Sequence, residues 1–363
     1  MPFELDTSVD GNSVNFADDR IIPFRQNTPA ERILITGARG FLGSEIARQL
    51  DAAGLAVTAL ARQWPSEAIP SRHVTRGTGD ITDAASIWPL FEGVTTVIHS
   101  AGLAHQFGRT ATRADAFRQV NVQGTENVLR AAVAANVKHV VLVSSVSVYG
   151  GGADPTDESF PCKPIDPYGI SKWQAEQVAR EIAEATGIRL TILRMATIFG
   201  EGDPGNIGRL MQAIDRGRFI WLGTGANQKS LIYRGDAARA CVLAAQSRIG
   251  SKLASPELAR IYNVTLPAVR VARIVDALAN GLGRPTPRWY IPSPLVKTIG
   301  GGLAACMARR GPVARMYRTI SKWLSDDVYL GEKFERDYQF HPEVSVEEGL
   351  RRETEWFRHS KAA

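Results

Sequence analysis

Residues 33–43 read Ile-Leu-Ile-Thr-Gly-Ala-Arg-Gly-Phe-Leu-Gly, and this stretch decides the fold. The apolar run predicts a buried strand, and the three glycines that follow predict a tight turn into a helix ending near residue 53. Glycine lets backbone N–H groups approach a diphosphate at the positive end of a helix. The stretch therefore predicts a dinucleotide-binding loop, although two residues separate its first two glycines where Gly-x-Gly-x-x-Gly has one. The candidate cofactor-binding residues of this loop are Gly37, Arg39, Gly40, Phe41, Leu42 and Gly43.

Further apolar runs at 57–61, 94–99, 140–144 and 190–193 alternate with stretches of helical spacing. This alternation is typical of right-handed βαβ units and predicts an α/β fold with a Rossmann-like, doubly wound parallel sheet. We expect a cofactor-binding domain over residues 31–200. Residues 201–357 are expected to form mainly a smaller, interleaved substrate lobe, with strands that return to the main sheet after about residue 240. Residues 1–30 are expected to be a poorly ordered extension, not a signal peptide, because they lack an apolar core region.

The bulk composition is that of an ordinary globular protein. The chain has 363 residues, of which 44% are hydrophobic, and a net charge of +6. Its three cysteines are widely spaced, which argues against a disulfide framework or a metal site and favours a cytoplasmic location. We find no nucleic-acid motif and no apolar run of membrane-spanning length. A basic, amphipathic segment at 287–323 is interpreted as a lid or dimer helix, with a membrane-leaning tail as the alternative.

The end of the second expected strand bears on the choice of cofactor. An acidic residue there would bind the ribose 2′-hydroxyl, but this chain has Ala61 followed by Arg62. Together with Arg39 of the glycine loop, Arg62 favours a 2′-phosphate and hence NADP, with NAD as the alternative. Both arginines could also be solvated surface groups. Asp80 and Ile81 follow a third expected strand, where a contact to the adenine edge is expected.

The sequence Asp166-Pro167-Tyr168-Gly169-Ile170-Ser171-Lys172 predicts the start of a helix, with Asp166 as N-cap and Pro167 at the first helical position. Tyr168 and Lys172 then share one helix face, because they are four residues apart. An ammonium near a phenol is expected to lower its pKa toward the range useful for acid/base catalysis. Before this helix, serines and a tyrosine at 144–150 follow an expected strand.

These motifs, in this order, resemble the extended short-chain dehydrogenase/reductases, the group that contains nucleotide-sugar epimerases, dehydratases and 4-ketoreductases. The resemblance runs from about Arg32 to Phe357. It implies that Ser145 hydrogen bonds to the substrate oxygen, that Tyr168 exchanges the proton, and that Lys172 binds the nicotinamide ribose. It also implies a homodimer. By the same resemblance, Ser100, Ala101 and Gly102 form a turn that lies against the bound cofactor, and Asn121 has a structural role.

The resemblance implies a nucleotide-diphosphate sugar as substrate, in bacterial polysaccharide biosynthesis. Asn206 and Lys229 are the candidates for binding its diphosphate, and Asp236 is expected to cap a helix that begins near Ala237. Epimerases of the group carry Asn where this chain has Thr197, and dehydratases carry an acid/base pair that is absent after Ser145. We therefore favour an NADPH-dependent 4-ketoreductase. A UDP-sugar 4-epimerase with tightly bound NAD is the alternative, and reduction of a sterol-like or phenolic ketone is a third hypothesis.

Overall fold

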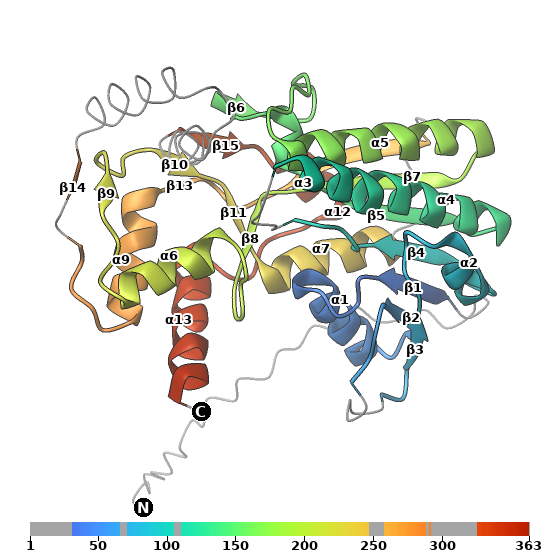
Figure 1. The fold of residues 1–363 in the computed structure, drawn as a ribbon, viewed down its shortest axis with the longest axis horizontal. Helices are drawn as coiled ribbons and strands as arrows, with labels where there is room; N and C mark the ends of the chain where they lie inside the picture. Colours follow the sequence, from blue (N-terminus) through green and yellow to red (C-terminus); the bar gives the residue numbers. More distant parts are fainter. Residues whose placement is uncertain are drawn as a thin grey trace, which may run out of the picture.

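The computed structural model describes residues 31–65, 71–104, 110–246, 258–287, 290–291 and 325–362. The expected N-terminal extension and almost all of the basic segment 287–323 lie outside these residues. Figure 1 shows the arrangement of the elements.

A seven-stranded parallel sheet forms the centre of the molecule. It confirms the predicted Rossmann-like α/β fold. Its strands, in spatial order, are β12 (Ala259–Val264), β7 (Arg189–Met195), β5 (His139–Ser145), β4 (Thr96–His99), β1 (Arg32–Thr36), β2 (Ala56–Ala61) and β3 (Val74–Thr78). Strand β12 is the expected return of the chain to the main sheet after residue 240, and it pairs with β7 in parallel.

Helices cover both faces of this sheet (Figure 1). One face carries α1 (Phe41–Ala52) and α7 (Arg234–Gln246), which pack against each other. The other face carries α4 (Gly124–Ala134) and α5 (Pro167–Thr186). Two apolar cores, one on each face, are built from the β-branched and leucine residues of the strands and the inward faces of these helices. Short elements complete this layer: α2 (Ala84–Ile87), η1 (Trp88–Phe91), α3 (Thr110–Phe117), the π-helical η2 (Arg118–Gln123) and η3 (Val146–Tyr149).

The remaining elements lie mostly after residue 196 and comprise helices and short strands. The helices are α6 (Asn206–Asp215), α9 (Val271–Gly281), α12 (Glu332–Tyr338) and α13 (Val346–Ala362), and the strands form smaller sheets. A four-stranded sheet contains β13 (Val269–Arg270), β10 (Gln228–Lys229), β15 (Asp327–Tyr329) and β6 (Gly152–Thr156). Two strand pairs join β11 (Leu231–Tyr233) to β8 (Thr197–Phe199) and β14 (Tyr290–Ile291) to β9 (Trp221–Leu222).

Helix α5 begins where the sequence predicts. The Asp166 carboxylate accepts a hydrogen bond from the Gly169 N–H at 2.8 Å, and Pro167 occupies the first turn. The helix ends at Thr186, and the next residue, Gly187, has a φ of 75°, the left-handed conformation that a C-terminal glycine adopts readily. This start places Tyr168 and Lys172 in the first two turns, near the carboxyl end of β5.

Candidate active site

The glycine loop joins β1 to α1 at the carboxyl end of the sheet. Gly37 has a φ of 71°, and a Cβ on Gly43 would lie 2.1 Å from the Gly37 carbonyl oxygen. Both positions therefore require glycine. Helix α1 starts without a side-chain cap and without an acidic residue in its first turn. Its first N–H groups are thus available to an anion, which fits the diphosphate of a dinucleotide cofactor.

The turn after β4 lies directly beside this loop. A Cβ on Gly37 would lie 2.8 Å from the backbone of Ala101, and the Ala101 N–H donates to Thr36 Oγ1 at 3.1 Å. A Cβ on Gly102 would lie 3.9 Å from Lys172 Nζ. The structure therefore brings the glycine loop, the 100–102 turn and the ammonium of α5 together.

The two arginines expected to favour NADP lie at the edge of the same site. Arg39 donates from Nη1 to the Gln63 carbonyl at 2.8 Å, which holds its guanidinium beside the chain that follows Arg62. Both side chains are exposed, whereas Ala61 at the end of β2 is buried. Asp80 accepts hydrogen bonds from the N–H and hydroxyl of Thr82, and Ile81 is buried, so both shape the loop after β3.

The three candidate catalytic side chains meet where β5 ends and α5 begins. Ser145 is the last residue of β5, and its hydroxyl lies close enough to the Tyr168 phenol to influence its pKa. Lys172 is 6% exposed and donates from Nζ to the Val143 carbonyl at 2.6 Å. The ring of Phe117 packs against that of Tyr168, with centroids 6.0 Å apart.

The expected lowering of the tyrosine pKa is wrong for this structure. Burial raises the pKa of Tyr168 to about 12, and the hydrogen bond from Ser145 offsets only part of that rise. The Lys172 ammonium donates its hydrogen bond to the Val143 carbonyl. Burial also lowers the pKa of Lys172 to about 8, and the nearby Glu176 carboxylate acts in the opposite direction.

These values assign the protonation states. Near neutral pH the Tyr168 phenol is protonated and Lys172 is largely a cation, so the site offers two O–H donors and one positive charge. Such donors stabilise negative charge on a carbonyl or alkoxide oxygen during hydride transfer. His99 is not part of this chemistry, since Thr36 and Thr125 hydroxyls lie 2.7 and 3.0 Å from its two ring nitrogens.

A family model matches more than half of the chain. The model described as "NAD dependent epimerase/dehydratase family" matches residues 33–264, from β1 to β12. The chain belongs to the NAD dependent epimerase/dehydratase family. It is therefore an NAD-dependent enzyme of the extended short-chain dehydrogenase/reductase type, as the sequence motifs predicted.

Known proteins resemble this chain over most of its length. An *N*-acetyl-α-D-glucosaminyl-diphospho-ditrans,octacis-undecaprenol 4-epimerase of Escherichia coli O157:H7 is 33% identical over 73% of this chain and 76% of its own length. A 2-alkyl-3-oxoalkanoate reductase of Stenotrophomonas maltophilia is 30% identical over 88% of this chain and 98% of its own. The structure of MoeE5 in complex with UDP-glucose and NAD is 27% identical, with a TM-score of 0.71, and the match covers 91% of this chain and 99% of MoeE5.

The candidate substrate residues of this family member lie on separate elements after β7. Thr197 begins β8 and is half-buried, whereas Asn206 begins α6 and is exposed. Lys229 was expected to offer its charge to a phosphate. Its ammonium instead forms a 2.6 Å ion pair with Asp327 of β15, because β10 and β15 are neighbours in the small sheet.

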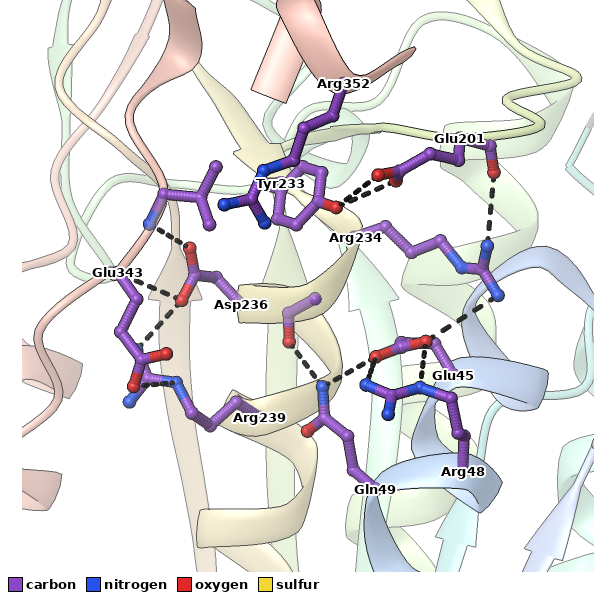
Figure 2. A pocket seen from close by; sticks show the side chains of 12 residues that line it. Glu45, Arg48, Gln49, Glu201, Tyr233, Arg234, Asp236, Arg239, Glu343 and Arg352 are labelled. Atoms are coloured by element: carbon purple, nitrogen blue, oxygen red, sulfur yellow. Dashed lines mark hydrogen bonds and ion pairs between the residues drawn. The ribbon is translucent and has the colours of Figure 1, made fainter. Parts of the chain in front are cut away.

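A separate cavity of about 400 Å³ lies beside α1 and α7 (Figure 2). Three of its lining arginines, Arg48, Arg234 and Arg239, pair with carboxylates of the same cavity, for example Arg48 with Glu45 at 2.6 Å. Asp236 lies here and does not cap α7, which begins two residues earlier at Arg234. Its carboxylate instead accepts hydrogen bonds from the N–H groups of Glu343 and Val344, both at 3.0 Å.

Asn121, in the π-helical turn, donates to Ser171 Oγ at 2.9 Å and bonds both backbone groups of Leu103, contacts that suit the structural role implied by the resemblance. Sequence reasoning missed the ion pair behind Lys172. Glu176, four residues after Lys172, is fully buried and pairs with Arg194. The regular spacing of Tyr168, Lys172 and Glu176 was the available signal.

Within the described part of the chain, no cluster of histidine, cysteine or carboxylate side chains could hold a metal ion. None of the helices described there combines the length and apolar character that crossing a membrane requires.

Proposed function

We propose that this enzyme transfers a hydride at C4 of a sugar carried on a diphosphate, and that it acts as a 4-epimerase. The observation that carries the proposal is the meeting of the Ser145 hydroxyl, the Tyr168 phenol and the Lys172 ammonium beside the glycine loop. The relatives support the substrate class: the E. coli relative is a 4-epimerase of a diphosphate-linked sugar, and MoeE5 binds UDP-glucose and NAD.

The side chains divide the chemistry in a simple way. The glycine loop and the 100–102 turn would hold the cofactor, with Lys172 at its ribose. A bound nicotinamide would supply the acceptor for the C4 hydride and the donor for its return to the opposite face of the sugar. Tyr168 donates its proton to the sugar oxygen when the ketone is reduced. To remove the proton of the 4-hydroxyl in the other direction, the phenol would first have to be ionised, which the positive charges of an oxidised cofactor and of Lys172 would favour. Ser145 donates a hydrogen bond to the same oxygen in both directions.

A 4-ketoreductase that uses NADPH is the second candidate, and Arg39 and Arg62 favour it. Arg39 belongs to the glycine loop, Arg62 directly follows the end of β2, and no carboxylate follows Ala61, a combination that suits a ribose 2′-phosphate. A reductase must exchange its cofactor at every turnover, whereas an epimerase regenerates it. The two candidates therefore differ in cofactor retention as well as in product.

The test begins with the cofactor that heat releases from the purified protein, analysed for its 2′-phosphate. Epimerase activity is expected as interconversion of C4 epimers with no added cofactor, assayed in parallel on UDP-*N*-acetylglucosamine and on polyprenyl-diphospho-*N*-acetylglucosamine. Reductase activity is expected as oxidation of one NADPH per UDP-4-keto-6-deoxysugar reduced. Turnover only of a 3-oxoalkanoate or a sterol acid, run as further arms, would overturn the proposed sugar substrate.

Changing both arginines to alanine tests the cofactor preference. In Arg39→Ala/Arg62→Ala we expect the Kd for NADPH to rise roughly 10- to 100-fold, because the two exposed charge-assisted phosphate contacts together contribute about 1–3 kcal/mol. The Kd for NADH should change little, since it has no 2′-phosphate. Fluorescence titration with both cofactors measures this. Arg130→Ala, at an exposed ion pair on α4, serves as the control. An equal rise in the Kd values for NADPH and NADH would argue against a 2′-phosphate site.

Four expectations from the sequence stay predictions: the homodimer, the cytoplasmic location, the role in polysaccharide assembly and the division into domains at residue 200.

A further inference from the structure

Glu176 continues the row of functional groups on α5. Tyr168, Lys172 and Glu176 follow one another at four-residue intervals, so their side chains share one face of the helix. The row runs from the half-buried phenol to Glu176, which is 0% exposed. An anion therefore lies one turn behind the cation of the proposed active site.

Two strands of the main sheet fix this carboxylate. Arg194 of β7 donates from Nη2 to Glu176 Oε2 at 2.7 Å and from Nε to both carboxylate oxygens. Ser144 of β5 donates from its hydroxyl to Glu176 Oε1 at 2.5 Å. Ser144 precedes Ser145, so the same carboxylate that lies behind Lys172 also fixes the strand end that carries the substrate-facing hydroxyl.

The part of the Arg194 guanidinium that points away from Glu176 also has a hydrogen-bond partner. Its Nη1 donates to the Tyr149 hydroxyl at 2.9 Å, and that hydroxyl donates to Asn263 Oδ1 of β12 at 2.8 Å. The guanidinium also lies over the Tyr149 ring, 4.9 Å from its centroid. The guanidinium is thus bonded on both sides, to Glu176 and to Tyr149, and these partners keep it fixed in the core.

The electrostatic surroundings of Lys172 are simple. From β4 it faces His99, whose pKa is lowered to about 3 by burial and by the lysine itself, so this imidazole is neutral. On its own helix, Tyr168 lies four residues before it and Glu176 four residues after it, and the Glu176 carboxylate raises the pKa of the lysine. Arg194 of β7 approaches the carboxylate from the strand side.

We propose that Glu176 is a positioning residue of the active site: it keeps the Lys172 side chain cationic and holds the end of β5 against α5. This inference rests on the proposed function, because it gives Lys172 its charged role in hydride transfer. Stability alone does not explain the arrangement, since a buried ion pair is often no more stable than apolar side chains of similar volume. An apolar pair would fill the core but would leave Lys172 without an anion.

The experiment follows the titration of Lys172 directly. The full-length protein is labelled with 13C at the lysine ε carbon, and the Lys172 resonance is identified by its loss in Lys172→Arg. In Glu176→Gln we expect this resonance to titrate roughly one pH unit below the wild-type protein. The alkaline limb of kcat/KM against pH should move down by the same amount, because the cation is lost sooner. Glu176→Asp, which keeps the charge, should titrate close to wild type.

Two further variants serve as controls, one for a folding defect caused by an unpaired buried charge and one for the loss of any carboxylate from α5. Glu176→Gln/Arg194→Met leaves no unpaired charge in the core, and its Lys172 should still titrate below wild type. Glu181→Gln removes an exposed carboxylate from the same helix and should change nothing. An unchanged Lys172 titration in a folded Glu176→Gln protein, or an equal shift in Glu176→Asp, would overturn the inference. The NMR titration needs no substrate, so it remains decisive if the proposed sugar chemistry fails.

Discussion

Replacing Tyr168 with phenylalanine is expected to lower kcat by about 10²–10⁴-fold, the range that a positioned proton donor contributes. The phenol is the group that exchanges a proton with the substrate oxygen, and the ring alone cannot do so. Because the ring still packs against Phe117, the pocket should keep its shape. The Kd of the cofactor, measured by fluorescence or calorimetry, should therefore stay within about threefold of wild type.

A matched control removes a tyrosine hydroxyl far from this chemistry. The Tyr262 hydroxyl lies 3.1 Å from an Asp337 carboxylate oxygen, between β12 and α12. Tyr262→Phe is expected to cost some stability and little turnover. Turnover by Tyr168→Phe at a rate close to that of Tyr262→Phe would show that another group supplies the proton, and the proposed mechanism would then be abandoned.

The second large effect concerns stability. Arg194→Met is expected to lower the free energy of unfolding by about 3–5 kcal/mol, because it leaves the Glu176 carboxylate buried without its counter-ion. Arg194 is 2% exposed and Glu176 is 0% exposed, so water cannot replace the lost partner. Urea unfolding monitored by circular dichroism measures the change, provided that the midpoint shifts and the slope does not.

The double variant separates the cost of an unpaired charge from the value of the pair. Glu176→Gln/Arg194→Met is expected to recover most of the stability lost in Arg194→Met, since the carboxylate is gone. Arg130→Met, at an exposed ion pair of α4, should change stability by less than about 1 kcal/mol. If Arg194→Met and the double variant were equally destabilised, lost packing would explain the effect and the charge would not.

Much of the fold could be predicted from the sequence because the signals are local. Asp166, Pro167 and Gly187 mark the ends of α5 through backbone conformation and short-range hydrogen bonds. Gly37 and Gly43 mark the turn from β1 into α1, where no side chain fits. Alternating strand and helix patterns then leave few topologies other than a doubly wound parallel sheet.

The sequence thus determined the family, the cofactor loop and the spacing of Tyr168 and Lys172. Only the tertiary structure decided their electrostatics. It raised the pKa of Tyr168 through burial, paired Lys229 with Asp327 across 98 residues, and placed Arg194 and Ser144 on Glu176. The reason is physical: helix ends and turns depend on neighbouring residues, whereas the charge state of a buried group depends on partners that only folding brings within reach.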